Sequence, residues 1–302
     1  MLILAPRKAA SERHDRLSGS VLPKTSILDR VILTPGEKLA DAPANDMLPG
    51  YRLKEYARAM SGDQLVSYRV WDAPTRWFHW INALTVLGLI LVGILILFAG
   101  SLGVSPTGKV TIKAIHVWIG YAMALNLLWR FVWAFLGNKY ARWRAILPGG
   151  PGYLAALEAY VSAFVAGHPK HYLGHNPIGR LAVLVILLLL VVQAVTGLVL
   201  AGTDLFYPPF GSWIARWVAA SNVDPSTLTP LARDLMDQTA YGAMRAFRAP
   251  FVETHEFTFY LLVAVVIVHV AAVVMTELRE GGTLVSAMLT GRKIVSGRPE
   301  DL

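Results

Sequence analysis

The chain has 302 residues, of which 55% are hydrophobic and only 16% are charged, and its mean hydropathy is +0.48. This composition is typical of a membrane protein with several spans and argues against two soluble domains. The formal net charge is +8. Cysteine is absent, and its absence excludes disulfides, thiolate metal sites, iron–sulfur clusters and the cysteine-based attachment of c-type haem.

Residues 1–65 form a polar, proline-punctuated stretch of mixed charge before the first apolar segment. Charged residues interrupt the start of the chain where a secretory signal needs its apolar core, so we predict no cleaved signal. We expect a loosely ordered cytoplasmic extension over residues 1–65, a membrane domain over residues 66–295 and a short tail over residues 296–302.

Four apolar segments are long enough to cross about 30 Å of hydrocarbon as helices that rise ~1.5 Å per residue. Stretches such as "GVSPTG", "LPGGPG" and "YPPFG" separate them. Because backbone groups in lipid must be satisfied within the segment, each span should be a helix. The sequence therefore predicts an all-α membrane protein with a four-transmembrane-helix bundle, whose spans lie near Trp77–Ala99, Lys113–Leu136, Arg180–Ala201 and Glu256–Thr276.

Lysine and arginine gather before the first span, between the second and third spans and after the fourth. The first connection offers only Lys109 and Lys113, and the third mixes arginines with aspartates. The positive-inside rule then places both termini in the cytoplasm and the first and third connections outside. We expect a multi-pass protein of a bacterial inner membrane, surrounded by lipid. No nucleic-acid partner is expected, because topology explains the basic charge.

The third connection, residues 203–254, is long and is expected to lie in the periplasm. Trp213 and Trp217 are four residues apart, so a short helix here would present both on one face. Such a helix would serve either as an aromatic anchor among the lipid headgroups or as part of a docking platform for an outer partner.

Four of the eight histidines fall on or just inside the spans. An ionisable residue in a membrane helix usually faces the bundle interior and marks a functional site. The predicted orientation puts His116 and His255 near the outer face, whereas His79 and His269 lie near the inner face, ~21 Å lower. Two such pairs suit bis-histidine ligation of two haem groups, one at each level.

Other interpretations of these histidines are weaker. A single buried histidine that bonds across helices would be ordinary, but four in two matched layers are not. Metal transport would need acidic or thiolate partners at the same depth, and aspartate and glutamate are missing from the span interiors. Gly88 and Gly120 leave room for a flat ring. Gln193 and Thr196, in the third span, are expected to form interhelical hydrogen bonds.

Five short motifs occur in an order and spacing that resembles the bacterial cytochrome b561 and Ni/Fe-hydrogenase cytochrome b family. They are "RWFHW" at 76–80, "HVWIG" at 116–120, "GHNPIG" at 174–179, "HEF" at 255–257 and "VHV" at 268–270. The resemblance covers residues 68–295, although the third connection is longer than is usual. The group includes membrane subunits of respiratory hydrogenases and formate dehydrogenases, and the resemblance implies that the four matched histidines ligate two b haems.

Two arginines reach the level of the inner histidine pair. Arg130 lies fourteen residues after His116 on the second span, and Arg76 lies beside His79 on the first. Arg130 would pair with a haem propionate or a quinone oxygen, or would instead anchor its helix at the headgroups, and Arg76 has the same alternatives.

The resemblance to formate dehydrogenase subunits also implies a quinone near the inner haem, against the segment that enters the third span. The candidate quinone-binding residues are then His175, Asn176 and Arg180. Asparagine and histidine hydrogen-bond quinone oxygens, and histidine can carry the accompanying proton. The alternative is a solvated basic loop.

The predicted function is electron transfer by a membrane di-haem b-type cytochrome, between a periplasmic redox partner and the quinone pool. The resemblance favours a NiFe hydrogenase as this partner, and a multihaem c-type cytochrome or another periplasmic oxidoreductase fits the longer connection equally well. The chain would be a quinone-linked subunit of an oxidoreductase complex, and we predict no catalytic residue in it. A haem-free transporter and a membrane anchor are the rival functions.

Overall fold

The computed structural model describes residues 66–167, 170–280, 284–295 and 298–302, without the side chains of residues 279 and 280. The predicted N-terminal extension, residues 1–65, lies outside the described residues.

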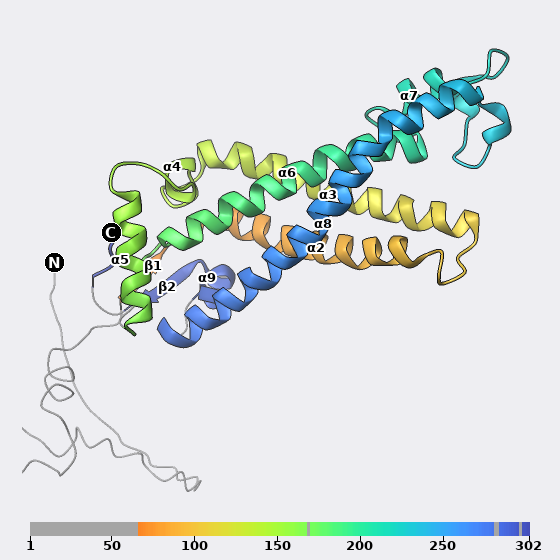
Figure 1. Cartoon of the computed structure of the whole chain (residues 1–302). Helices are drawn as coiled ribbons and strands as arrows, with labels where there is room; N and C mark the ends of the chain where they lie inside the picture. The colour runs from red at the N-terminus through yellow and green to blue at the C-terminus, as the bar shows by residue number, and fades with distance from the viewer. Residues whose placement is uncertain (1–65, 168–169, 281–283, 296–297) are drawn as a thin grey trace, which may run out of the picture. The chain divides into compact units, whose positions relative to one another are not determined.

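Four long helices form the membrane domain (Figure 1): α2 (Ala73–Phe98), α3 (Pro106–Leu136), α6 (Pro177–Leu205) and α8 (Gln238–Glu280). Within the described residues, these four are long and apolar enough to cross a membrane. The prediction of a helical membrane protein with four spans is therefore confirmed. Large apolar side chains such as Leu84, Leu125 and Ile267 are more than half exposed, as expected where lipid surrounds a helix.

Three of the long helices begin with a polar capping residue followed by proline within the first turn. The side chains of Asp72, Ser105 and Asn176 accept hydrogen bonds from the backbone N–H three residues further on. This pairing satisfies one of the N–H groups that a helix start leaves without a partner, and proline there loses nothing because its missing N–H would be unpaired. The helices thus begin a few residues before the apolar segments that hydropathy detects.

The four helices pack as two hairpins, α2 with α3 and α6 with α8, and the hairpins meet along α3 and α6. By contrast, the backbone of α8 does not pack closely against α2 or α3. The shared apolar core contains Val86, Met123, Leu127, Leu190 and Leu262. Helix α8 therefore meets the two helices that carry His79 and His116 through side chains rather than through close backbone packing.

The fourth span differs from its prediction in where its helix begins. We expected a helix from Glu256, but α8 is continuous from Gln238 and runs for 43 residues, with Pro250 inside it. At ~1.5 Å per residue it is about twice as long as the ~30 Å hydrocarbon layer is thick. Pro250 removes one helical hydrogen bond without ending the helix. Hydropathy found only the apolar part of α8, because residues 238–255 are amphipathic.

The first and last segments of the membrane domain pair with each other at one end of the bundle, which we call the strand end. There β1 (Val66–Arg69) pairs antiparallel with β2 (Arg292–Val295), and Val66 lies opposite Val295. Three short helices lie at the same end of the bundle, and they are α4 (Trp143–Ile146), α5 (Tyr153–Val165) and α9 (Leu284–Thr290), of which α9 packs against β2. The sequence did not predict the two strands. Their position on one side agrees with an even number of spans, and the strand end is the end predicted to face the cytoplasm.

The opposite end carries a compact cap built from the predicted long connection. It contains α7 (Gly211–Val218), the 3-10 turns η3 (Pro225–Thr227) and η4 (Arg233–Leu235), and the first turns of α8. Ile214, Val218, Met236 and Met244 form a separate apolar core within it. The predicted short helix is confirmed as α7, and Trp213 on it is 69% exposed. Residues 203–254 are therefore mostly folded rather than an extended linker, and Figure 1 shows this cap beyond the body of the bundle.

One carboxylate joins three helices where the cap meets the bundle. Asp204, near the end of α6, contacts both Lys113 of α3 and Arg248 of α8. The side chains of Asp204 and Arg248 are only 15% and 20% exposed, so water screens this contact less than it screens a surface ion pair. The contact holds α3 and α8 to α6 on the side of the bundle nearest the cap.

We predict that Asp204→Asn destabilises the purified protein in detergent by about 1–3 kcal/mol, because two partly buried cations lose their counter-charge. A lower midpoint of thermal unfolding would measure this loss. Asp234→Asn is the matched control, because Asp234 is an exposed aspartate of the same cap. Equal midpoints for the two variants would contradict the prediction.

Candidate histidine-paired haem sites

The histidine pair nearer the cap consists of His116 on α3 and His255 on α8. Their ring centroids are 6.3 Å apart and the ring planes are inclined by 72°. Metal–imidazole bonds are ~2 Å long and a ring nitrogen lies ~1 Å from its ring centroid, so two imidazoles on opposite sides of one metal have centroids ~6 Å apart. The observed separation suits two axial ligands of a single iron.

A cavity lies beside these two rings, and all four long helices line it. Its walls are largely apolar and include Val86, Ile90, Met123, Leu190 and Leu262 in addition to the two histidines. The enclosed space is only about 70 Å³, so the surrounding side chains would have to move apart to admit a porphyrin between the two rings. An apolar slot with two imidazoles is the surrounding that an iron porphyrin requires.

Glycines give both rings room. A Cβ atom on Gly93 would lie 3.6 Å from Cε1 of His116, and one on Gly197 would lie 3.4 Å from Cε1 of His255. The sequence had suggested Gly88 and Gly120 for this purpose. Gly120 does line the cavity, with nothing within 4 Å of a Cβ placed there, whereas Gly88 packs against Ile119. Gly93 and Gly197 carry no signal in the sequence alone, because their positions opposite a histidine depend on how the helices are rotated.

Helix α6 holds His255 although it bears no histidine of its own. Thr196 Oγ1 lies 2.7 Å from Nδ1 of His255, and the side-chain amide of Gln193 donates to the backbone carbonyl of His255 at 2.9 Å. Gln193 also donates to Thr258 Oγ1 at 3.0 Å. The prediction that Gln193 and Thr196 form interhelical hydrogen bonds is therefore confirmed, and His255 is the residue that they contact.

The histidine pair nearer the strand end consists of His79 on α2 and His269 on α8. The two side chains are close enough to interact electrostatically, and both are partly buried. Nδ1 of His79 is buried and has no hydrogen-bond partner among the residues that the structure describes. The rings of His116 and His255 thus lie in contact, and His79 and His269 lie near enough to influence each other, which is the pairing that the sequence predicted by depth.

Several buried polar atoms at the strand end also lack partners within the described part of the chain. They are Thr75 Oγ1, Arg76 Nε, Asn82 Oδ1, Arg130 Nη1 and His175 Nδ1. Native proteins leave few buried polar atoms unpaired, so such a concentration indicates a site for a polar group. The donors among these atoms suit the carboxylates of a haem or the oxygens of a quinone.

The two predicted arginines are placed differently at this site. Arg130 is 4% exposed, donates one hydrogen bond to the carbonyl of Ala141 at 3.0 Å and lies over the ring of Phe78. Arg76 donates to the carbonyl of Leu289 at the end of α9, so part of its guanidinium holds that helix. Arg130 is too deeply buried to reach the headgroups as a surface anchor.

His175 lies just before α6, and its ring packs against Trp71 with the centroids 5.0 Å apart. Burial, with the nearby positive charges of Arg130, Arg180 and Lys293, lowers the pKa of His175 to about 3. The imidazole is therefore neutral at physiological pH. A neutral imidazole can both donate and accept a hydrogen bond, but it carries no additional proton at that pH.

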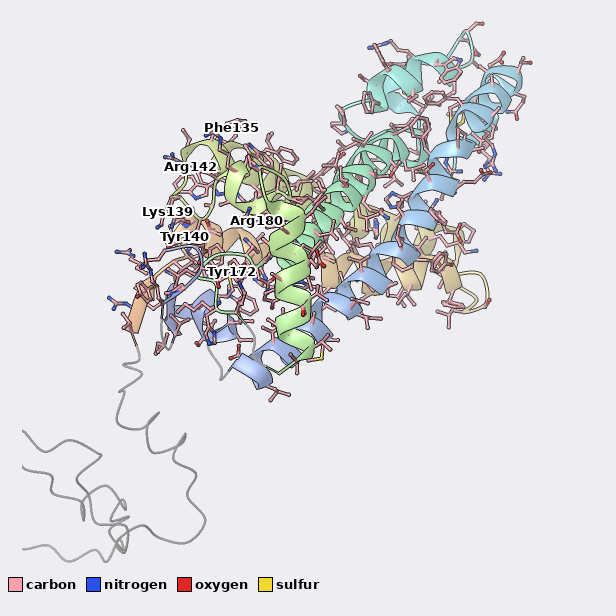
Figure 2. The ribbon with its side chains drawn as sticks, turned by 60° about the vertical axis from the view of Figure 1, so that its left-hand side comes forward. Phe135, Lys139, Tyr140, Arg142, Tyr172 and Arg180 are labelled. Carbon is pink, nitrogen blue, oxygen red and sulfur yellow. The ribbon has the colours of Figure 1, made fainter. Side chains whose placement is uncertain are left out.

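Both polar atoms of the Asn176 side chain form hydrogen bonds. Its oxygen caps α6 by accepting from the N–H of Gly179 at 2.7 Å, and its amide donates to the hydroxyl of Tyr160 at 2.7 Å. The structure thus gives Asn176 a role in ordering the segment beside His175. Arg180 lies one turn into α6, and Figure 2, in which the strand end is turned forward, labels it together with Tyr172.

Neither histidine pair is part of a larger metal cluster. No group of three or more histidine, aspartate or glutamate side chains is gathered around one point in the described ranges. Iron in a porphyrin needs only two axial ligands from the protein, since the macrocycle supplies the other four. The donor set present at each level is therefore sufficient for a bis-histidine haem.

Comparison with known proteins identifies a family of membrane cytochromes. The sequence model for prokaryotic cytochrome b561 matches residues 70–291. A probable Ni/Fe-hydrogenase B-type cytochrome subunit of Rhizobium leguminosarum bv. viciae is 27% identical over 252 residues, which cover 78% of this chain and 92% of the relative. The probable Ni/Fe-hydrogenase 1 B-type cytochrome subunit of Escherichia coli K12 is 26% identical over 246 residues, which cover 76% and 92%.

A third relative, the probable Ni/Fe-hydrogenase B-type cytochrome subunit of Bradyrhizobium diazoefficiens, is 26% identical over 277 residues, which cover 84% of this chain and 97% of the relative. No solved structure gives a significant match. The family match spans the four long helices and both histidine pairs. The chain belongs to the prokaryotic cytochrome b561 family.

Proposed function

We propose that the protein is a di-haem b-type cytochrome that carries electrons between a redox partner at the cap end and a quinone at the strand end. Membership of the cytochrome b561 family implies b-type haem. The observation that carries the proposal is the approach of His116 and His255, from two helices whose backbones do not pack closely, beside an apolar cavity. Bound haem would supply a one-electron iron couple at each level.

The protein's own residues would bind the two haems, orient them and enclose them in apolar surroundings. His116 and His255 would hold one haem, and His79 and His269 would hold the second, with Thr196 keeping the ring of His255 in place. Arg130 and Arg76 would receive the propionates of the second haem, because each has a buried nitrogen without a partner in the described residues. The apolar residues between the two levels keep water away from this path.

The quinone site would lie between His175 and the start of α6. His175 and Arg180 would hydrogen-bond the quinone oxygens, while Asn176 would mainly hold the segment that carries His175. Protons would then come from the side of the strand end, which is the predicted cytoplasmic side. Membrane lipid would surround the four spans.

A NiFe hydrogenase is the partner that the relatives favour, because three of them are named as B-type cytochrome subunits of Ni/Fe hydrogenases. The predicted topology puts the cap in the periplasm of a bacterial inner membrane, so the partner would dock there. The exposed tryptophans of α7 suit either the docking surface or a contact with headgroups. The chain would act as the quinone-linked subunit of the complex.

We predict that the purified protein contains two b-type haems per chain. A dithionite-reduced minus oxidised spectrum, with haem quantitation, measures this number. A protein without a b-type α band would contradict the proposal and support a haem-free transporter or an anchor. One haem per chain would contradict the two-level arrangement.

We predict that His269→Ala loses the haem at the strand end and that His255→Ala loses the haem at the cap end. Each variant should retain about half of the parent's haem, and redox titration should show the loss of a different component in each. His171→Ala is the matched control, since His171 belongs to neither pair. Loss of the same component in both variants would overturn the pairing by depth.

We predict that His175→Leu lowers the rate of electron exchange with a soluble quinone analogue by about tenfold, as expected when one hydrogen bond to the substrate is lost. His175→Gln should keep most of the rate because glutamine still donates, and His171→Leu should keep all of it. Because His175 is neutral above its pKa of about 3, the pH profile between pH 5 and 8 should be alike in His175→Gln and the parent. A parent-like rate in His175→Leu, or a profile that changes in His175→Gln, would argue against this role.

A further inference from the structure

We infer that Thr196 is a positioning residue for the haem at the cap end: it fixes the tautomer and the orientation of His255, and it lowers the midpoint potential of that haem. This inference rests on the proposed function, because it takes His255 as an iron ligand. It adds a residue of α6, a helix that supplies no histidine to either pair.

The hydrogen-bond pattern around Thr196 defines the direction of each bond. Its hydroxyl lies 2.7 Å from the carbonyl oxygen of Val192 and 2.7 Å from Nδ1 of His255. A hydroxyl has one hydrogen to donate and a carbonyl oxygen can only accept, so the hydrogen goes to Val192. Oγ1 of Thr196 then accepts from His255, which places the imidazole proton on Nδ1. We assign the tautomer from this pattern.

The consequence is that Nε2 of His255 carries the free lone pair. A neutral imidazole has one protonated nitrogen and one that can bind a metal, and the partner of the first determines which is which. In the opposite tautomer, Nε2 would hold the proton and could not bind iron. The chain of bonds from His255 through Thr196 to Val192 therefore selects the form of His255 that binds a haem.

Thr196 acts together with its neighbours on one face of α6. Gln193, Thr196 and Gly197 are spaced i, i+3 and i+4, so they lie on the same side of the helix. Gln193 bonds the backbone carbonyl of His255, Thr196 bonds its ring, and Gly197 leaves room beside Cε1. One face of α6 thus determines the position of the His255 backbone, of its ring nitrogen and of its ring edge.

The other ligand of the same haem is held differently. Nδ1 of His116 is buried and has no hydrogen-bond partner in the described portion of the chain. A hydrogen bond from Nδ1 of an axial histidine makes the imidazole more basic, and a more basic ligand favours ferric over ferrous iron. Of these two ligands, His255 is therefore the one through which the protein adjusts the haem potential.

The test is a redox titration of the haems in Thr196→Val, Thr196→Ser and the parent protein, followed in the α band. Valine has nearly the shape of threonine but cannot accept a hydrogen bond. We expect Thr196→Val to raise the midpoint potential of the cap-end haem and to change its low-spin ferric electron paramagnetic resonance signal. The strand-end haem should be unchanged, and Thr196→Ser should resemble the parent because it keeps the hydroxyl.

Thr203→Val is the matched control. Thr203 is another buried threonine of α6, and its hydroxyl bonds to carbonyls within its own helix. We expect it to leave both potentials unchanged, which separates the contact with His255 from a general effect of replacing threonine.

The inference is overturned if Thr196→Val holds both haems at the parent's potentials, if the strand-end haem shifts instead, or if Thr203→Val shifts the same component equally. If Thr196→Val loses the cap-end haem altogether, Thr196→Ser decides: a parent-like serine variant supports the role of the hydroxyl, and loss in both variants contradicts it. A parent protein without haem would instead refute the proposed function.

Discussion

The fourteen-residue interval between His255 and His269 on α8 is the constraint that organises the rest of the bundle. Fourteen residues are close to four turns of an α-helix, so both rings leave the same face of α8, ~21 Å apart along its axis. The partner rings come from two antiparallel helices, with His79 near the start of α2 and His116 in the first half of α3. One continuous helix therefore serves both levels, and a change of its register would displace both pairs together.

The two ends of the bundle balance buried charge in different ways. Near the cap, Asp204 compensates Lys113 and Arg248 within the protein. At the strand end, the carboxylate of Asp72 already accepts hydrogen bonds from Thr75, Trp133 and Asn138. Burial alone would raise the pKa of Asp72, but these hydrogen bonds lower it. Arg130, beside His175, therefore keeps one guanidinium nitrogen without a partner among the described residues. Under the proposed function, this incomplete polar site is where the quinone would bind.

The sequence predicted the spans and the histidine pairs because both depend on local properties: apolar length, the rise of a helix and alternating direction. It did not predict the pairing of Val66–Arg69 with Arg292–Val295, because these four-residue strands are more than two hundred positions apart. The sequence also predicted that the fourth helix begins at Glu256, which is where the amphipathic part of α8 ends. The partner of Thr196 could not be predicted either, because it depends on the rotation of α6 against α8.

The division into two hairpins links haem binding to the assembly of the bundle. Each haem would take one ligand from the α2–α3 hairpin and one from α8 of the other hairpin, and α8 packs closely on neither α2 nor α3. The backbones of the two hairpins pack most closely along α3 and α6. A ligand that bonds to both hairpins favours their association by its own binding free energy. Since α6 already orients His255 through contacts within its hairpin, that ligand position is preorganised before the second hairpin contributes His116.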